Sequence, residues 1–212
     1  MPADARQAHD HAALSPLRYP SPKSPPAQIH RRIAPRRYRI ARSSFMTITV
    51  FVYGTLKRGQ CNHHRFCRYA IEIRPATVVG RLYHLPAGYP ALEIPREAIL
   101  AVGTGDPLAD AETQASFATR DLVMPEATHD WGTVHGELIT FADPARDLPP
   151  LDRLEGFRSD GDGLYRRALV AAKAVTQVEA VWLYHMVDYG RGRLLQGGFW
   201  KGNISVHPPS ER

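Results

Sequence analysis

The 212-residue sequence is poor in cysteine, with two in the whole chain. Two cysteines cannot build the disulfide framework of a small secreted domain, so we expect a reducing compartment and place the protein in the cytoplasm. No apolar run approaches the roughly 20 residues that a membrane-spanning helix needs, and an apolar signal-peptide centre is missing, so we expect no membrane partner. The sequence also lacks a Gly-x-Ser-x-Gly motif, which removes the anchor for a serine-nucleophile hydrolase.

Residues 1–45 differ from the rest of the chain in charge and composition. They contain 9 of the 27 Lys and Arg residues, 2 of the 21 Asp and Glu residues and 7 of the 18 prolines, which leaves the remainder 18 basic and 19 acidic residues. We predict a disordered tail, because its few apolar residues cannot offset the entropy of ordering, followed by a domain at 46–212. The tail is a nucleic-acid arm, an Arg-rich targeting peptide or, as we favour, a start-site artefact or inert extension, because Met46 directly precedes the first strand. Nothing in the near-neutral body indicates nucleic-acid binding.

Apolar residues at a period of two predict at least five strands, bounded by Gly, Pro or charged residues. These strands are expected at 47–53, 78–85, 134–141, 165–172 and 178–186. Three short helices are expected at 62–69, 107–122 and 148–155. Because strands dominate and helices do not alternate with them, we predict an α+β fold, with a mixed β-barrel or curled sheet rather than a doubly wound sheet.

The segment 95–131 is long for a connection between strands, so we expect a lid, a wall or an insertion there. Its helix begins behind Asp106 and Pro107, which together are a typical start signal. Gly103-Thr104-Gly105-Asp106 resembles a phosphate-binding loop, but the third glycine and the long preceding strand of that motif are missing.

A glycine-rich turn follows the first predicted strand, with the sequence Tyr53-Gly54-Thr55-Leu56-Lys57-Arg58-Gly59. It is not a P-loop, because Gln60 and Cys61 stand where Lys and Ser or Thr are needed. Gly54 lets the backbone approach a ligand closely, and amides that leave a strand end can converge on an oxygen atom. The spacing alone favours the alternative, an ordinary strand-to-loop turn.

Glu155 stands in the last turn of the helix expected at 148–155, which Asp147 is predicted to cap and Gly156 to end. A carboxylate there faces the negative end of the helix dipole, and dipole and partial burial both raise its pKa. A pKa near neutrality suits a group that accepts and returns a proton. The alternative is a solvated glutamate at a frayed helix end. Asp152, one turn earlier, is expected to cap the helix or to face solvent.

The run Cys61-Asn62-His63-His64-Arg65-Phe66-Cys67 places potential metal ligands close together. Zinc sites usually draw paired ligands from two separated segments, and the chain has no second cysteine pair. We therefore favour one helix turn with mixed exposed and packed residues, and we expect no metal.

Blocks of sequence that share their order and type with one known family run from Met46 to about Met186. They lie at 50–59, 79–83, 88–92, 134–138, 151–157, 165–167 and 181–184. The Tyr-Gly-Thr-Leu block at 53–56 and the Leu-Glu-Gly block at 154–156 are the more specific. Because these blocks occur together and in this order, the chain resembles the gamma-glutamylcyclotransferase-like family.

The resemblance implies a small mixed β-barrel with short flanking helices and a ligand cavity at one end. It implies that the backbone of the 53–56 turn holds the gamma-glutamyl group of a substrate and that Glu155 is the catalytic acid/base. The residues implied to bind substrate are Tyr53, Gly54, Thr55, Leu56, Tyr165, Arg167 and, as a weaker transfer, Tyr184. The segment 95–131 is longer than in compact members of the family and can reshape the cavity.

The implied activity is that of a cyclotransferase. A gamma-glutamyl amine or peptide would give 5-oxoproline and a free amine by intramolecular acyl transfer, with no metal or organic cofactor. The alternative is a module without catalytic activity that binds a small metabolite in the same barrel. The expected partner is a small-molecule gamma-glutamyl substrate, and the sequence leaves the leaving group and the oligomeric state open.

Overall fold

The computed structural model describes residues 46–118, 120–175 and 177–202. The predicted tail at 1–45 lies outside these residues, so the boundary at residue 46 stays a prediction. Among the described residues, no helix is both long and apolar enough to cross a membrane.

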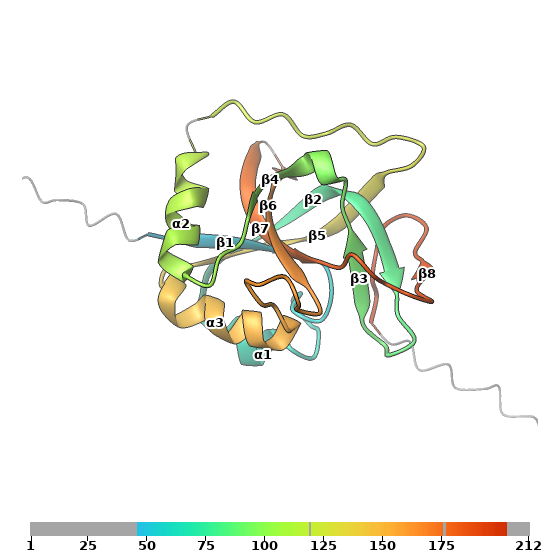
Figure 1. The fold of residues 1–212 in the computed structure, drawn as a ribbon, viewed down its shortest axis with the longest axis horizontal. Coiled ribbons are helices and arrows are strands. Elements are labelled where there is room, and N and C mark those ends of the chain that lie inside the picture. Colours follow the sequence, from blue (N-terminus) through green and yellow to red (C-terminus); the bar gives the residue numbers. More distant parts are fainter. Residues whose placement is uncertain (1–45, 119, 176, 203–212) are drawn as a thin grey trace, which may run out of the picture. The chain divides into compact units, whose positions relative to one another are not determined.

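Five strands form a closed barrel in the order β2–β5–β1–β7–β6, and a pairing between β6 and β2 completes it (Figure 1). The barrel is mixed, because β1 runs parallel to β7 while the other neighbours are antiparallel. Its strands are β1 (Ile48–Val52), β2 (Ala70–His84), β5 (Gly132–Phe141), β6 (Arg166–Ala174) and β7 (Val178–His185). Three short strands extend the sheet: β3 (Pro90–Glu93), β4 (Ile99–Val102) and β8 (Arg193–Leu194). The predicted α+β class with a mixed barrel is therefore confirmed.

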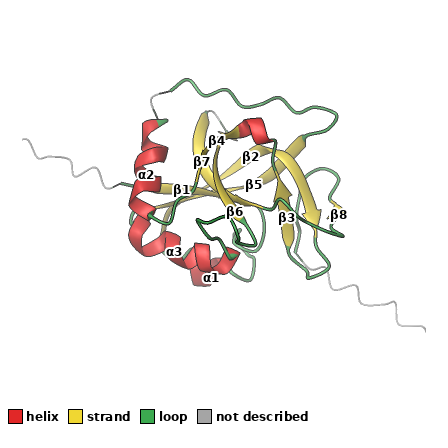
Figure 2. Cartoon of the chain, viewed as in Figure 1, coloured by secondary structure: helices red, strands yellow, loops and turns green. Residues whose placement is uncertain are grey.

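The three α-helices, apart from the short 3₁₀ turn beside β4, gather on one side of the barrel in Figure 2 (red). They are α1 (His63–Phe66), α2 (Pro107–Ser116) and α3 (Pro144–Glu155), with one 3₁₀ turn at Arg96–Ala98. Both α1 and α2 contact α3. The chain from α2 to β5 then passes over the barrel as a long irregular stretch (Figure 1).

The alternation seen in the first strand sorts its side chains into two layers of core. Ile48, Val50 and Val52 pack with Leu148 and Leu151 of α3, which places them between the barrel and the helices. Phe51 and Tyr53 belong to the other layer, which fills the barrel with residues such as Val78, Leu138 and Val181. Every residue of β1 is thus buried, and the turn that follows β1 leaves the barrel from a fixed position.

Two predicted boundaries are wrong for identifiable reasons. Strand β2 begins at Ala70 rather than at 78, because its charged first half pairs with β5 while Arg74 lies on the surface in an ion pair with Glu179 (2.7 Å). Helix α3 begins at Pro144 rather than at 148. Asp143 is its cap, accepting the amide of Arg146 at 3.0 Å, while Asp147 is buried inside the helix.

The segment 95–131 is largely part of the fold rather than a separate insertion. Strand β4 pairs with β6, and α2 packs against α3. The helix α2 starts behind Asp106 as predicted but ends at Ser116, before the predicted limit of 122. The part that remains a long connection is irregular over the described residues 117–118 and 120–131.

Gly136 of β5 provides a test of this packing. A Cβ added there would lie 2.3 Å from the Val52 carbonyl oxygen and 2.6 Å from the Phe51 ring. We expect Gly136→Ala to lower the free energy of unfolding by about 1–3 kcal/mol, because the backbone of β1 has to shift. The matched control is Gly132→Ala on the same strand, whose added Cβ meets nothing closer than 3.7 Å. Denaturant unfolding that gives both variants the same stability contradicts the assignment.

Candidate active site

A cavity of about 250 Å³ lies where the turn after β1 meets the end of α3. Its walls come from six parts of the chain, brought together by the barrel. The lining residues are Phe51, Val52, Tyr53, Gly54, Thr55, Leu56, Asn62, Tyr89, Pro90, Leu154, Glu155, Leu164, Tyr165 and Tyr184. Every predicted site residue except Arg167 is in this set.

The turn after β1 lines the cavity with residues whose backbone amides have no acceptor among the described residues. Gly54 to Lys57 form a β-turn, closed by the bond from the Lys57 amide to the Gly54 carbonyl (3.1 Å). In the described part of the chain, the amides of Gly54, Thr55 and Leu56 donate to no acceptor. Gly54 is required here because a Cβ would lie 2.5 Å from Cγ of Pro90 on the opposite wall. The turn can therefore offer several hydrogen-bond donors to one anionic or carbonyl group.

Glu155 is the last residue of α3, and Gly156 ends the helix in a left-handed conformation (φ 60°). The Glu155 carboxyl faces the cavity, and burial raises its pKa to about 7. The negative end of the helix dipole acts in the same direction. No hydrogen-bond donor in the described residues holds its oxygens. The carboxyl is thus placed and poised to exchange a proton with a ligand near neutral pH.

Two tyrosine hydroxyls lie near this carboxyl and have already used their hydrogens. Tyr53 donates to the carbonyl of Tyr184 at 2.8 Å, and Tyr165 donates to the carbonyl of Pro90 at 2.7 Å. Burial raises the pKa of both hydroxyls, and the Glu155 charge raises both further. Because a hydroxyl has a single hydrogen, the Tyr53 and Tyr165 oxygens can only accept bonds from a ligand, and Glu155 accepts when it is ionised. This side of the cavity therefore complements the donor side formed by the turn.

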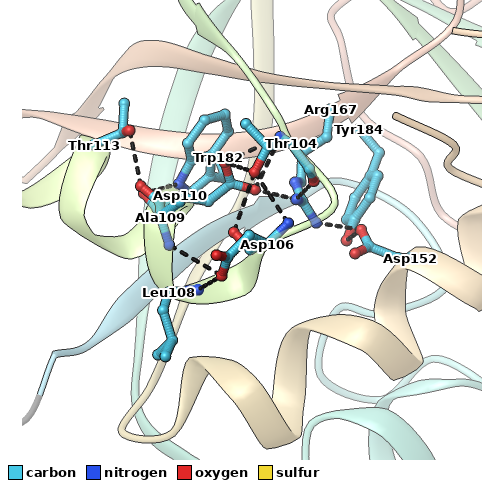
Figure 3. A network of polar contacts seen from close by, with 10 residues as sticks. All are labelled: Thr104, Asp106, Leu108, Ala109, Asp110, Thr113, Asp152, Arg167, Trp182 and Tyr184. Atoms are coloured by element: carbon cyan, nitrogen blue, oxygen red, sulfur yellow. Dashed lines mark hydrogen bonds and ion pairs between the residues drawn. The ribbon is translucent and has the colours of Figure 1, made fainter. Parts of the chain in front are cut away.

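Arg167 does not line the cavity but lies in a buried ion network behind it (Figure 3). Its guanidinium is fully buried and binds the carboxylates of Asp110 on α2 and Asp152 on α3, as well as the Thr104 carbonyl (2.7 Å). Tyr184, which lines the cavity, donates its hydroxyl to the same Asp152 at 2.7 Å. The network therefore joins both helices to the strands that carry Arg167 and Tyr184.

Asp152 is neither a helix cap nor solvated, so that expectation is wrong. Its carboxylate accepts bonds from Arg167 and Tyr184, one helical turn before Glu155. Burial raises its pKa, while the charge of Arg167 acts in the opposite direction. The contact fixes the end of α3, and with it the position of Glu155.

The two other motifs, at 103–108 and 61–67, are parts of the folded structure and not ligand sites of their own. In the loop at 103–108, the Thr104 amide donates to Asp110 (3.0 Å) and Asp106 caps α2, so protein carboxylates occupy the donors that a phosphate would need. In the run at 61–67, Cys61 is exposed and Cys67 is buried. Among the described residues, no three His, Cys, Asp or Glu side chains are grouped as metal ligands.

Seven of the lining residues were not predicted as site residues: Phe51, Val52, Asn62, Tyr89, Pro90, Leu154 and Leu164. Pro90 and Tyr89 belong to a block that carried the family resemblance, which was a usable signal. Asn62 sat inside the run considered for metal, and Leu164 on a loop without any pattern.

The sequence is similar to a known family over most of its described residues. The sequence matches the family described as gamma-glutamyl cyclotransferase, AIG2-like, over residues 50–114 and 107–202. The chain belongs to this family. No curated protein matches the sequence significantly. As a gamma-glutamyl cyclotransferase family member it carries the Tyr53-Gly54-Thr55-Leu56 turn and Glu155 within the matched region.

Three solved structures are similar to this chain at low sequence identity. YkqA from Bacillus subtilis matches with a TM-score of 0.45 and 17% identity, over 73% of this chain and 39% of its own length. An aig2-like protein from Mus musculus matches with a TM-score of 0.39 and 18% identity, over 68% of this chain and 80% of its own length. The uncharacterized protein PH0828 from Pyrococcus horikoshii matches with a TM-score of 0.39 and 16% identity, over 72% of this chain and 88% of its own length. The family assignment rests on the sequence match and not on these likenesses.

Loss of Arg167 tests the buried network. We expect Arg167→Ala to lower the free energy of unfolding by about 3–5 kcal/mol, because it leaves the carboxylates of Asp110 and Asp152 buried without their cation. Arg166→Ala, at the exposed neighbouring position, is the matched control and should change stability little. Equal stabilities in urea titrations of the two variants are incompatible with the network described.

Proposed function

We propose that the chain is a cyclotransferase that converts a gamma-glutamyl amine or peptide into 5-oxoproline and a free amine. The observation that supports this most is the meeting, in one cavity, of the Glu155 carboxyl with raised pKa and the free amides of the 53–56 turn. Family membership supports a cyclotransferase type of reaction. The two free cysteines support a cytoplasmic location, where thiols stay reduced.

The proposed reaction is an acyl transfer within the substrate. The α-amine nitrogen attacks the γ-carbonyl carbon and forms the C–N bond of a five-membered lactam, while the C–N bond to the leaving amine breaks. Glu155 takes one proton from the α-ammonium before attack and delivers it to the leaving nitrogen. The second proton that the ring nitrogen loses passes to the released amine, which leaves as an ammonium ion, so protons balance and no water is consumed. Because nucleophile and electrophile share one molecule, the protein mainly supplies orientation.

The two sides of the cavity suit the two charges of a gamma-glutamyl group. The amides of Gly54, Thr55 and Leu56 would hold the substrate's negatively charged oxygens and stabilise the oxyanion that develops during attack. The acceptor oxygens of Tyr53 and Tyr165 would receive the N–H groups of the α-ammonium beside Glu155. The proposal assigns Tyr184 to the wall and Arg167 to positioning rather than to direct contact.

The proposal is tested by incubating the purified full chain with gamma-glutamyl amino acids, glutathione and gamma-glutamyl-lysine. We expect at least one of them to release 5-oxoproline together with an equal amount of free amine. Release of glutamate instead would indicate hydrolysis. Binding of these compounds without any product would sink the cyclotransferase and favour the metabolite-binding module.

The role of Glu155 is tested by Glu155→Gln, which keeps the size of the side chain and removes its proton exchange. We expect 5-oxoproline formation to fall by about 10²–10⁴-fold, the usual contribution of a general acid/base, while substrate binding by calorimetry stays nearly unchanged. Glu112→Gln, at an exposed position of α2, is the control and should keep wild-type rates. Full activity in Glu155→Gln refutes the assignment.

The pH dependence of kcat/KM offers an independent test of the same group. Burial raises the pKa of Glu155 to about 7, and the mechanism needs the deprotonated carboxylate to accept the first proton. The rate should therefore rise with pH and its acidic limb should bend near 7, because kcat/KM reports the groups of the free enzyme. A limb that bends near the ordinary carboxyl value would show that a solvated group, and not this one, is the base.

A further inference from the structure

The short helix α1 carries a side chain that hydrogen-bonds to the backbone of the turn after β1. The ring Nδ1 of His63 lies 2.8 Å from the Leu56 carbonyl oxygen. Because a carbonyl oxygen can only accept, the ring carries its hydrogen on Nδ1 and donates it. The Cys67 thiol is 3.7 Å from the same oxygen and is a much weaker donor.

From His63, hydrogen bonds run through two peptide groups to a free amide. His63 donates to the Leu56 carbonyl, and the amide of that peptide group, on Lys57, donates to the Gly54 carbonyl (3.1 Å). The Gly54 peptide group ends in the Thr55 amide. In a planar trans peptide, C=O and N–H point in opposite directions, so each bond fixes the direction of the next. This series of hydrogen bonds therefore ends in the Thr55 amide, which has no acceptor among the described residues and belongs to a residue that lines the cavity.

A second, shorter chain reaches the neighbouring amide. The Asn62 amide donates to the Thr55 carbonyl at 3.0 Å, and the amide of that peptide group belongs to Leu56. The Asn62 side chain also donates to the Thr55 hydroxyl (3.0 Å). Asn62, the N-cap of α1, and His63, its first residue, thus hold the carbonyls of Thr55 and Leu56. The amide of Leu56, which shares a peptide group with the Thr55 carbonyl, donates to no acceptor in the described residues.

We propose that His63 is a positioning residue, which orients and polarises the Thr55 amide through this hydrogen-bond chain. This inference rests on the proposed function, because it assigns that amide to substrate. Hydrogen bonds in a chain strengthen one another, so a donor at the far end makes the terminal N–H a better donor. The inference gives the His-containing run at 61–67 a purpose that needs no metal.

The test uses the full chain with three substitutions. His63→Ala removes the donor, while His63→Asn restores one, since asparagine also carries its nitrogen on Cγ, where histidine carries Nδ1. His64→Ala is the matched control, because His64 is exposed on the same helix. In ¹⁵N-labelled protein, we expect the Thr55 amide proton to move upfield in His63→Ala, to return most of the way in His63→Asn, and to stay in place in His64→Ala.

Kinetic measurements then test whether this series of hydrogen bonds contributes to the reaction. We expect His63→Ala to lower kcat/KM for 5-oxoproline formation by about tenfold, less than the loss of a whole oxyanion donor, with the acidic limb of the pH profile unchanged. His63→Asn should recover most of this rate. An unshifted Thr55 amide in His63→Ala, or no recovery of either readout in His63→Asn, overturns the inference. If the wild type forms no 5-oxoproline, the proposed function fails, and the Thr55 resonance still decides whether the chain of bonds exists.

Discussion

The buried guanidinium of Arg167 is the constraint on which the arrangement of the site depends. A charge without solvent needs partners, and its partners come from α2 and α3, so both helices are held to the strand that carries Arg167 (Figure 3). Asp152 also accepts a hydrogen bond from the Tyr184 hydroxyl, and it belongs to the same helix as Glu155. The ion pair therefore restricts the positions of both residues. The network thus holds α3 to the strands that carry Arg167 and Tyr184, and Tyr184 is its member that lines the cavity.

The cavity has opposite hydrogen-bonding characters on its two sides. Backbone amides provide donors, while a carboxylate and two hydroxyls that have used their hydrogens provide acceptors. A zwitterionic amino-acid group meets both requirements in one orientation only. For the proposed cyclisation this orientation is most of what the protein has to supply, because the attacking amine is already tethered to the carbonyl. One residue with a pKa near neutrality then suffices for both proton transfers.

The sequence predicted what short-range patterns determine. The period-two strands, the turn after β1 and Glu155 at a helix end were all found where expected. The charged first half of β2 was missed because the partner strand, and not its own pattern, makes it a strand. Arg167 was assigned to substrate through the family resemblance, which places a residue near a site but does not show which side its charge faces. His63 was missed as a positioning residue because its partner is a carbonyl, which leaves no mark on the sequence.

The most direct measurement of the central claim is a crystal structure of the protein soaked with 5-oxoproline, the proposed product. The account predicts that the lactam ring occupies the cavity, with its ring nitrogen next to the Glu155 carboxyl and oxygens on the amides of Thr55 and Leu56. A lactam bound outside this cavity, or bound inside it with its nitrogen turned away from Glu155, would contradict the account.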